Sequence, residues 1–332
     1  MDRTPLVYDG DCMVYTLRSA ELARTYCCYH VVGKDVDFIL KKSDLNEVSV
    51  YQNLNRGDIK PRLSAPRMYE YVELHNKATD DKAVFIALEH IAVSEGIGMT
   101  DCDDQVDGLL MYQNGSSAEA WESAGRELAR IQLTFWGIQP LQGVPYDGKD
   151  YDGLMREIRS SPRISMNRRL SDACEKVTER FTHMPRCLVN HDLFPINILI
   201  KERTFTAGTQ RVIHPQAYIV DWTNGRPGPY ILDLARVISH CHRETILDAR
   251  DMLYSPKYCS DRCRSAIVES YAHALGSKID RTELDKDLLC GEFFEIGRMF
   301  VQMPTVQPRD SYDRYYFFNM MSLADRVLTE LT

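Results

Sequence analysis

The chain has 332 residues, of which 44% are hydrophobic and 27% charged, a composition typical of a folded globular protein with one large domain or two lobes. Its net charge of −8 argues against a nucleic-acid partner, because binding phosphates requires a basic surface, and weakly favours a neutral or cationic ligand. No apolar run approaches the ~18 residues of a membrane span, and no signal-peptide pattern begins the chain, so we expect a cytoplasmic protein without a membrane partner.

The ten cysteines are expected to be reduced thiols that pack as small hydrophobic residues. The nearest approach to a zinc pattern is His240-Cys241-His242 followed by Cys259 and Cys263. It lacks a close-spaced CxxC pair, so ordinary packing is the favoured interpretation.

The front of the chain has the pattern of strands followed by a helix. Residues 25–40 read as two strands joined by a turn at Gly33-Lys34-Asp35, which predicts a hairpin. Asp44 and Glu47 then have the spacing of a capping box. The apolar residues that follow at helical spacing are Val48, Tyr51 and Leu54.

Alternating or apolar stretches at 68–74 and 83–88 extend the predicted sheet. We therefore predict an α+β fold with a small β-rich N-terminal lobe at 1–91, a glycine-containing connector at 92–116 and a larger, mainly helical lobe at 117–332. A capping box at Ser116 and Glu119 opens the second lobe. Its clearest apolar stripe at helical spacing is Leu289, Phe293, Ile296 and Phe300.

Two carboxylates follow short apolar strands in the second lobe. In LVNHDLFPINILI, Asp192 comes directly after a strand and Asn197 stands five residues later, with Pro195 stiffening the turn. Such a loop can aim a carboxylate at a hydroxyl while the carboxamide binds a metal. Asp221 ends the strand AYIV and suits a magnesium ligand, and Asp233 lies where a helix should begin.

These two segments resemble the aminoglycoside phosphotransferase and choline kinase superfamily, which has a protein-kinase-like fold of two lobes. The family's loop reads H-x-D-L-x-P-x-N, and NHDLFPIN matches it except that Asn190 replaces the histidine. IVDWTNGRPGPYILDLA matches the family's metal segment. Because Asn190 replaces the family's histidine, the contacts that support the Asp192 loop must differ from those of the family. His191 is assigned no catalytic role.

The resemblance implies nucleotide-binding residues in the first lobe. A lysine at the end of the third strand contacts the α- and β-phosphates and pairs with a glutamate on the next helix. Lys41 and Glu47 suit these roles, with Lys42 the less favoured lysine because it points to the opposite face, and with helix capping the alternative for Glu47. Backbone groups near Glu89 and Ile91 would bind adenine.

The implied function is ATP- and Mg²⁺-dependent transfer of the γ-phosphate to a hydroxyl of a small molecule, with Asp192 as the catalytic base and Asn197 and Asp221 as metal ligands. A non-catalytic nucleotide-binding module on the same fold is one alternative. A protein kinase is another, disfavoured because no HRD, DFG or APE segment is found.

The acceptor is expected to carry an amine, as in an aminoglycoside-like antibiotic, with a metabolite such as choline, homoserine or a sugar as the alternative. Glu292 and Glu295 stand three apart on one helix and are the candidate substrate-binding residues, with a solvated helix face as the favoured alternative. A cluster of aromatic residues near the C-terminal end of the sequence could form a different substrate pocket, although packing of the last helix explains most of them. These residues are Tyr312, Tyr315, Tyr316, Phe317 and Phe318.

Overall fold

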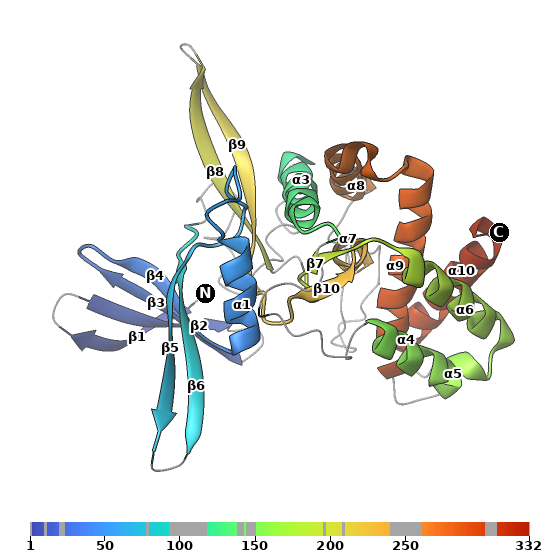
Figure 1. The fold of residues 1–332 in the computed structure, drawn as a ribbon, viewed down its shortest axis with the longest axis horizontal. Coiled ribbons are helices and arrows are strands. Elements are labelled where there is room, and N and C mark those ends of the chain that lie inside the picture. Colours follow the sequence, from blue (N-terminus) through green and yellow to red (C-terminus); the bar gives the residue numbers. More distant parts are fainter. Residues whose placement is uncertain are drawn as a thin grey trace.

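The structure is a computed structural model, which describes residues 2–9, 12–19, 24–77, 80–92, 118–137, 143, 151–194, 197–207, 210–239, 261–302 and 311–331. A β-sheet with one helix forms the N-terminal part, and a mostly helical part follows it (Figure 1). The predicted α+β class is confirmed.

The N-terminal sheet has six strands in the order β1-β2-β3-β4-β6-β5, all antiparallel to their neighbours. The predicted hairpin is confirmed, with His30 opposite Ile39 and Cys28 opposite Lys41. The strands are β1 (Asp2–Asp9), β2 (Cys12–Ser19), β3 (Arg24–Gly33), β4 (Asp37–Ser43), β5 (Met68–Asn76) and β6 (Asp81–Glu89).

Strands β1 and β2 were not predicted, because the expected sheet began at residue 25. Pro5 lies within β1, and a proline within a run of residues argues against a strand. The exception is an edge strand, where one side of the backbone has no partner to bond. β1 is that edge, and its pairing with β2 shifts register between Pro5 and Val7.

Helix α1 (Leu45–Leu54) follows β4 as expected, and its buried apolar side chains belong to the hydrophobic core. Asp44 is its N-cap, and the side chain of Asp44 accepts a hydrogen bond from the backbone N–H of Glu47 at 2.8 Å. The Glu47 carboxylate bonds to other partners, described below.

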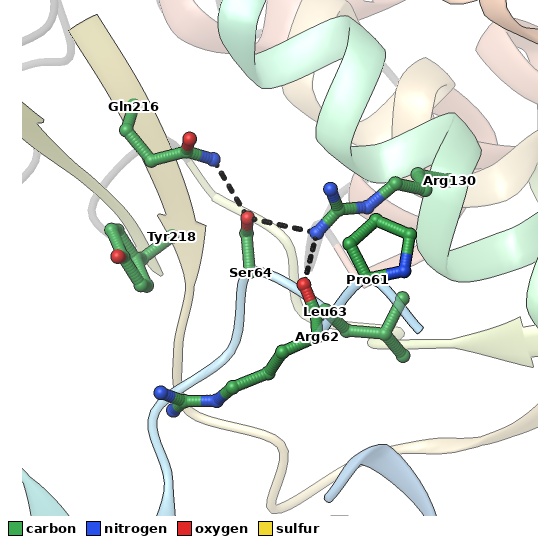
Figure 2. A pocket seen from close by; sticks show the side chains of 7 residues that line it. All are labelled: Pro61, Arg62, Leu63, Ser64, Arg130, Gln216 and Tyr218. Carbon is green, nitrogen blue, oxygen red and sulfur yellow. Dashed lines mark hydrogen bonds between the residues drawn. The ribbon is translucent and has the colours of Figure 1, made fainter. Parts of the chain in front are cut away.

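The loop between α1 and β5 joins the two parts of the molecule (Figure 2). The backbone N–H of Ile219 donates to the carbonyl of Ser64 at 2.9 Å, and Gln216 Nε2 donates to the Ser64 hydroxyl at 2.7 Å. Arg130 Nη2 donates to the carbonyl of Arg62 at 2.6 Å. These bonds fix the loop against α3 (Ala118–Thr134) and β9 (Gln210–Ile219).

Two short sheets hold the motif segments of the second part. β7 (Arg186–Val189) pairs with β10 (Arg226–Pro229), and β8 (Ile198–Ala207) pairs with β9 in a long hairpin that projects from the body (Figure 1). The predicted strands before Asp192 and Asp221 are β7 and the end of β9. Pro195 lies outside the described residues.

Helices make up most of the remaining described chain. They are α4 (Tyr151–Ser160), α5 (Pro162–Ser165), α6 (Arg168–His183), α7 (Leu232–Ser239), α8 (Asp261–Leu275), the 3₁₀ turn η3 (Gly276–Lys278), α9 (Arg281–Gln302) and α10 (Ser311–Glu330). The predicted stripe on α9 is confirmed, since all four of its side chains are buried.

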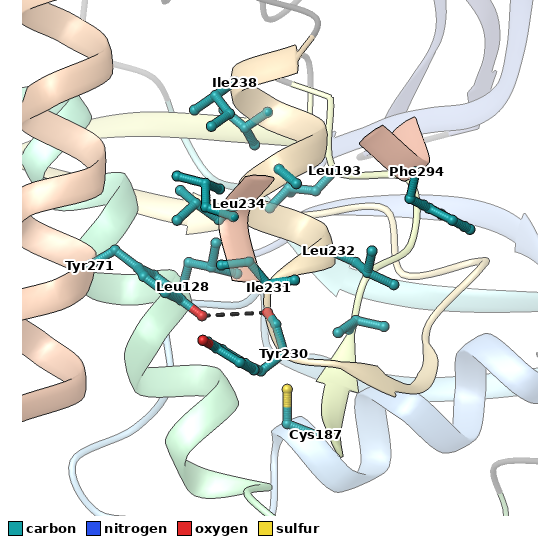
Figure 3. Packing of buried hydrophobic residues seen from close by; sticks show 14 of the residues in the cluster. Leu128, Cys187, Leu193, Tyr230, Ile231, Leu232, Leu234, Ile238, Tyr271 and Phe294 are labelled. Atoms are coloured by element: carbon teal, nitrogen blue, oxygen red, sulfur yellow. Dashed lines mark hydrogen bonds between the residues drawn. The ribbon is translucent and has the colours of Figure 1, made fainter. Parts of the chain in front are cut away.

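The main hydrophobic core gathers side chains from β7, α3, α7, α8 and α9 (Figure 3). Leu128, Tyr271 and Phe294 enter from three helices, and Cys187 enters from β7. α7 lies at the centre, with both its apolar and its polar side chains buried. Residues at its N-terminus are therefore held rigidly.

The predicted connector at 92–116 lies outside the described residues except for its first residue, as does Ser116 of the expected capping box. The lobe boundaries at 91 and 117 remain predictions. None of the described helices is both long enough and apolar enough to cross a bilayer.

The close packing of α3 on α8 can be tested at Gly125. A Cβ there would lie 2.3 Å from the carbonyl oxygen of Ile267, a backbone atom that can move only if a helix moves. We expect Gly125→Ala to lower the free energy of unfolding by about 1–3 kcal/mol, even though alanine is the better helix former by about 1 kcal/mol. Urea unfolding measures the change.

Gly57→Ala is the matched control, because a Cβ at Gly57 meets no atom within 4 Å. Its effect should stay within about 0.5 kcal/mol. A stabilised Gly125→Ala variant would contradict the observed helix spacing.

Candidate active site

Asp192 lies on the loop between β7 and β8, and Asn197 closes that loop. Asn197 Nδ2 donates to the Asp192 carbonyl at 2.8 Å, and the Asn197 N–H donates to the Phe194 carbonyl at 2.8 Å. Since Nδ2 is used within the loop, Oδ1 is the Asn197 atom that can bind a metal. The Asp192 side chain is 37% exposed, so a ligand can reach it.

Asn190 ties the Asp192 loop to the Asp221 segment. Its Oδ1 accepts from the Asp192 N–H at 3.1 Å, and its Nδ2 donates to the carbonyls of Val220 at 3.2 Å and Asp221 at 2.9 Å. The residue is fully buried. The asparagine thus provides the local support that the sequence left open, using both ends of its amide.

Asp233, at the start of α7, also holds this loop through its carboxylate. Its carboxylate oxygens accept from the N–H groups of Asn190 at 2.8 Å and His191 at 3.0 Å. Complete burial raises the pKa of Asp233 to about 7, against the lowering effect of these two bonds. The loop turns sharply here, with a φ of 67° at His191, and the carboxylate holds that turn.

Lys41 of the N-terminal sheet bonds to Asp221 and so connects the two parts of the molecule. Its Nζ donates to Glu47 Oε1 at 2.7 Å, to Asp221 Oδ1 at 2.6 Å and to the Thr223 hydroxyl at 2.8 Å. Lys42, the alternative lysine, is exposed on the other side of β4. The structure therefore joins Lys41, Glu47 and Asp221 in one cluster.

Glu47 takes part in the helix cap through its backbone N–H, which donates to Asp44, while its carboxylate faces this cluster. Oε1 also accepts from the Trp222 N–H at 3.1 Å, and Oε2 accepts from the Ser43 hydroxyl at 2.5 Å. The residue is fully buried. A buried carboxylate with several donors is rigidly oriented, so Glu47 fixes the position of Lys41.

Electrostatics keep Lys41 and Asp221 charged. Burial by itself lowers the pKa of Lys41, but the negative charges of Glu47 and Asp221 outweigh burial and hold the pKa above its ordinary value. Burial raises the pKa of Asp221, but the Lys41 ammonium outweighs burial and the pKa is lowered. Asp221 has a φ of 55° and a side chain 46% exposed, so its ionised carboxylate remains reachable.

Arg236 is a site residue that the sequence reasoning missed. From α7 its Nη2 donates to Asp192 Oδ1 at 2.5 Å, and its Nη1 donates to Glu295 Oε2 at 2.7 Å. The guanidinium carbon lies 4.0 Å from the centroid of the Phe194 ring. Its position could have been recognised in the sequence, because Arg236 stands three residues after Asp233 and this spacing puts both side chains on one face of the helix.

Glu292 and Glu295 are buried on α9, so the alternative of a solvated helix face is wrong. Glu292 pairs with Arg264 of α8 at 2.8 Å, whereas Glu295 pairs with Arg236 at 2.7 Å and Arg298 at 3.3 Å. A cationic ligand would have to compete with these arginines. Their role in substrate binding remains a prediction.

The aromatic residues of the last helix divide between core and surface. Tyr316 is buried, the Phe317 ring lies 6.2 Å from that of Phe300, and Phe318 is 67% exposed. The side chains of Tyr312 and Tyr315 lie outside the described residues, as do residues 240–242 and Cys259 of the weak zinc pattern. Packing of α10 accounts for Tyr316 and Phe317.

The predicted adenine-binding strand is β6 and its end. The Glu89 N–H donates to the carbonyl of Arg67 at 2.7 Å, and the Glu89 carboxylate binds Arg62. Ile91 is buried. An adenine contact at Glu89 would therefore use the carbonyl, since the N–H already has a partner.

A pocket of about 210 Å³ lies between the loop at 61–64, α3 and β9 (Figure 2). Its polar groups bond largely to one another: Arg130 and Gln216 both donate to the Ser64 hydroxyl. None of its lining residues belongs to the Asp192 or Asp221 groups.

No family model matches the sequence, and no curated protein matches it. Among solved structures, a choline/ethanolamine kinase family protein from Mesorhizobium loti matches with a TM-score of 0.48 and 11% identity over 91% of this chain and 89% of its own. Amicoumacin kinase hAmiN matches at 0.49 and 9%, over 99% and 88%. Spectinomycin phosphotransferase APH(9)-Ia matches at 0.45 and 15%, over 95% and 93%.

These matches belong to the group of proteins that the two motifs resemble. At such identities and TM-scores, the likeness adds no weight to a particular activity. The chemistry of this chain therefore has to follow from the geometry of its own residues.

His191 makes the fold sensitive to acid. Burial, followed by the charges of Arg298 and Arg226, lowers the pKa of His191 to about 3. The unfolded chain binds a proton near pH 6.5 and the folded chain does not, so stability present above pH 6.5 is lost as pH falls toward 3. We expect His191→Asn, which tolerates the positive φ, to flatten the slope of unfolding free energy by up to about 1.4 kcal/mol per pH unit.

Urea unfolding of both proteins at several pH values between 4 and 7 measures these slopes. His183→Gln, at the exposed end of α6, controls for the loss of an imidazole as such. Parallel pH curves for wild type and His191→Asn would refute the assignment.

Proposed function

We propose that this chain is an ATP- and Mg²⁺-dependent phosphotransferase that acts on a hydroxyl of a small molecule. The observation that carries the proposal is the Lys41, Glu47 and Asp221 cluster, whose backbone is bonded through Asn190 to the loop of Asp192. A phosphate-binding cation, a metal-binding carboxylate and a base are thus held within one hydrogen-bonded frame.

The nucleotide would lie between the sheet and the Asp221 segment. Lys41 keeps its charge and would contact phosphate oxygens, while Glu47 holds its ammonium in place. The Asp221 carboxylate and Asn197 Oδ1 are oxygen donors, the type that Mg²⁺ prefers, and Asp221 is partly exposed, so these residues fit the ion. Bound Mg²⁺ supplies positive charge that offsets the charge on the transferred phosphoryl group.

Asp192 is the proposed base. Its Oδ1 is held by Arg236, so the carboxylate has a fixed orientation and Oδ2 can accept the proton of an acceptor hydroxyl. The hydroxyl oxygen then attacks the γ-phosphorus, the bond to the leaving oxygen of ADP breaks, and the proton passes to Asp192. Asn190 and Asp233 position the loop and need not touch the substrate.

The acceptor is proposed to be an amine-bearing alcohol such as an aminoglycoside-like antibiotic, with choline, homoserine or a sugar as the alternative. The net charge of −8 favours a cation. Glu295 lies one arginine away from Asp192, so an acceptor ammonium could displace part of that pairing. A panel of such alcohols, screened for magnesium-dependent ATP consumption, identifies the class.

A non-catalytic nucleotide-binding module is the second candidate. The Lys41 cluster could bind a nucleotide in such a module, but a module without catalysis would not need the exposed Asp192 carboxylate as a base. ATP turnover that depends on the acceptor separates the two.

Asp192→Asn tests the base. We expect it to lower kcat about 100-fold or more and to change ATP affinity little, because proton transfer is lost in the transition state while the Lys41 cluster stays intact. Steady-state kinetics with the acceptor found in the panel and ATP titration by calorimetry measure the two effects. Near-full activity would remove Asp192 from this role.

Asp221→Ala tests the metal site. We expect ATP affinity to lose its dependence on Mg²⁺, because the exposed carboxylate oxygen that would bind the ion is removed. Lys41 keeps Glu47 as a partner, so the fold should persist. Calorimetry with and without MgCl₂ measures the dependence; an affinity enhanced by Mg²⁺ as in the wild type would move the metal elsewhere.

A further inference from the structure

Three potential metal ligands converge in the N-terminal sheet, away from the Asp192 loop. His30 lies on β3, Asp37 begins β4, and His90 follows the end of β6. These strands are neighbours in the sheet (Figure 1). One ligand atom from each side chain lies within 4.8 Å of the other two, and no other such group of three or more occurs among the described residues.

The two imidazoles point at a single carboxylate oxygen. His30 Nε2 lies 2.6 Å and His90 Nδ1 lies 2.9 Å from Asp37 Oδ1. The two rings stand side by side, with centroids 4.0 Å apart and planes inclined by 45°. Each ring therefore directs a nitrogen to the same small volume.

We propose that His30, Asp37 and His90 form a binding site for a Zn²⁺ ion. In a tetrahedral zinc site with bonds of about 2.0–2.1 Å, neighbouring ligand atoms are about 3.3 Å apart. The distances of 2.6 and 2.9 Å are shorter than that by about 0.7 and 0.4 Å, so the side chains would have to move apart by less than 1 Å to admit the ion. Two histidines with one carboxylate suit zinc, whereas Mg²⁺ and Ca²⁺ prefer oxygen ligands.

Burial is graded across the group in a way that suits a metal site. The side chain of His30 is 4% exposed, that of His90 is 19% exposed and that of Asp37 is 57% exposed. His30 is thus anchored in the sheet, and the open side at Asp37 leaves room for the ion to enter and for water as a fourth ligand. The ion would link β3, β4 and the residue that follows β6.

The sheet contains a natural comparison for this group. His75 Nε2 lies 2.7 Å from Asp80 Oδ1, which is a histidine and aspartate pair of the same kind. No third ligand joins it among the described residues. Two ligands hold zinc far more weakly than three, so His75→Gln is a matched control.

The test is calorimetric titration of ZnCl₂ into the full chain after treatment with a chelator, without nucleotide. We expect one zinc ion per chain, with affinity lowered about 100-fold or more in Asp37→Asn and in His90→Gln, since even outer-shell changes cost 10–100-fold. His30 is left unchanged because its burial makes loss of folding a risk. His75→Gln should bind zinc as the wild type does.

Asp221→Ala should also keep the zinc ion, which separates this site from the proposed nucleotide metal site. Because nucleotide is absent, the result does not depend on the proposed kinase activity. Absence of zinc binding by the wild type, or unchanged binding by both Asp37→Asn and His90→Gln, would overturn the proposal. The three side chains would then be a hydrogen-bonded group within the sheet.

Discussion

The buried ammonium of Lys41 is the interaction on which the rest of this structure depends. It bonds β4 to α1 through Glu47 and to the second part of the molecule through Asp221 and Thr223. Removal of one partner from a buried ion pair typically costs roughly 3–5 kcal/mol, because the other charge stays buried alone. The arrangement therefore positions the sheet, the helix and the Asp221 segment relative to one another.

The loop of Asp192 depends on a second set of polar contacts. Left-handed backbone at His191 and Asp221 is unfavourable for residues other than glycine, and the surrounding bonds must hold it. Asn190 and Asp233 do so, with both ends of the amide and both carboxylate oxygens bonded to backbone groups. Because α7 is buried along its length, the support beneath the loop is rigid.

The charges around Asp192 form a chain across three elements. Arg236 of α7 connects Asp192 to Glu295 of α9, and Arg298 adds a further contact to Glu295. A carboxylate paired in this way keeps one orientation, which favours transfer of a proton over binding of an arbitrary cation. Substrate recognition by Glu295 would thus be coupled to the position of Asp192.

Much of this arrangement followed from local patterns in the sequence. The alternation along β4 separated Lys41 from Lys42, because successive side chains of a strand face opposite sides. The spacing of Asp192 and Asn197 predicted one loop, since five residues after a strand leave room for a single turn. The strands from residue 25 to 88 and the first helix were likewise readable from apolar periodicity, whereas β1 and β2 were not.

Tertiary structure decided what depends on residues far apart in the chain. Glu47 also matched a helix cap by sequence, and only the approach of Lys41 and Trp222 assigned its carboxylate to the site. Glu292 and Glu295 matched an exposed face until α8 and α7 supplied arginines to bury them. His30, Asp37 and His90 converge because three strands lie side by side, and sheet pairing between distant segments has no signal in local spacing.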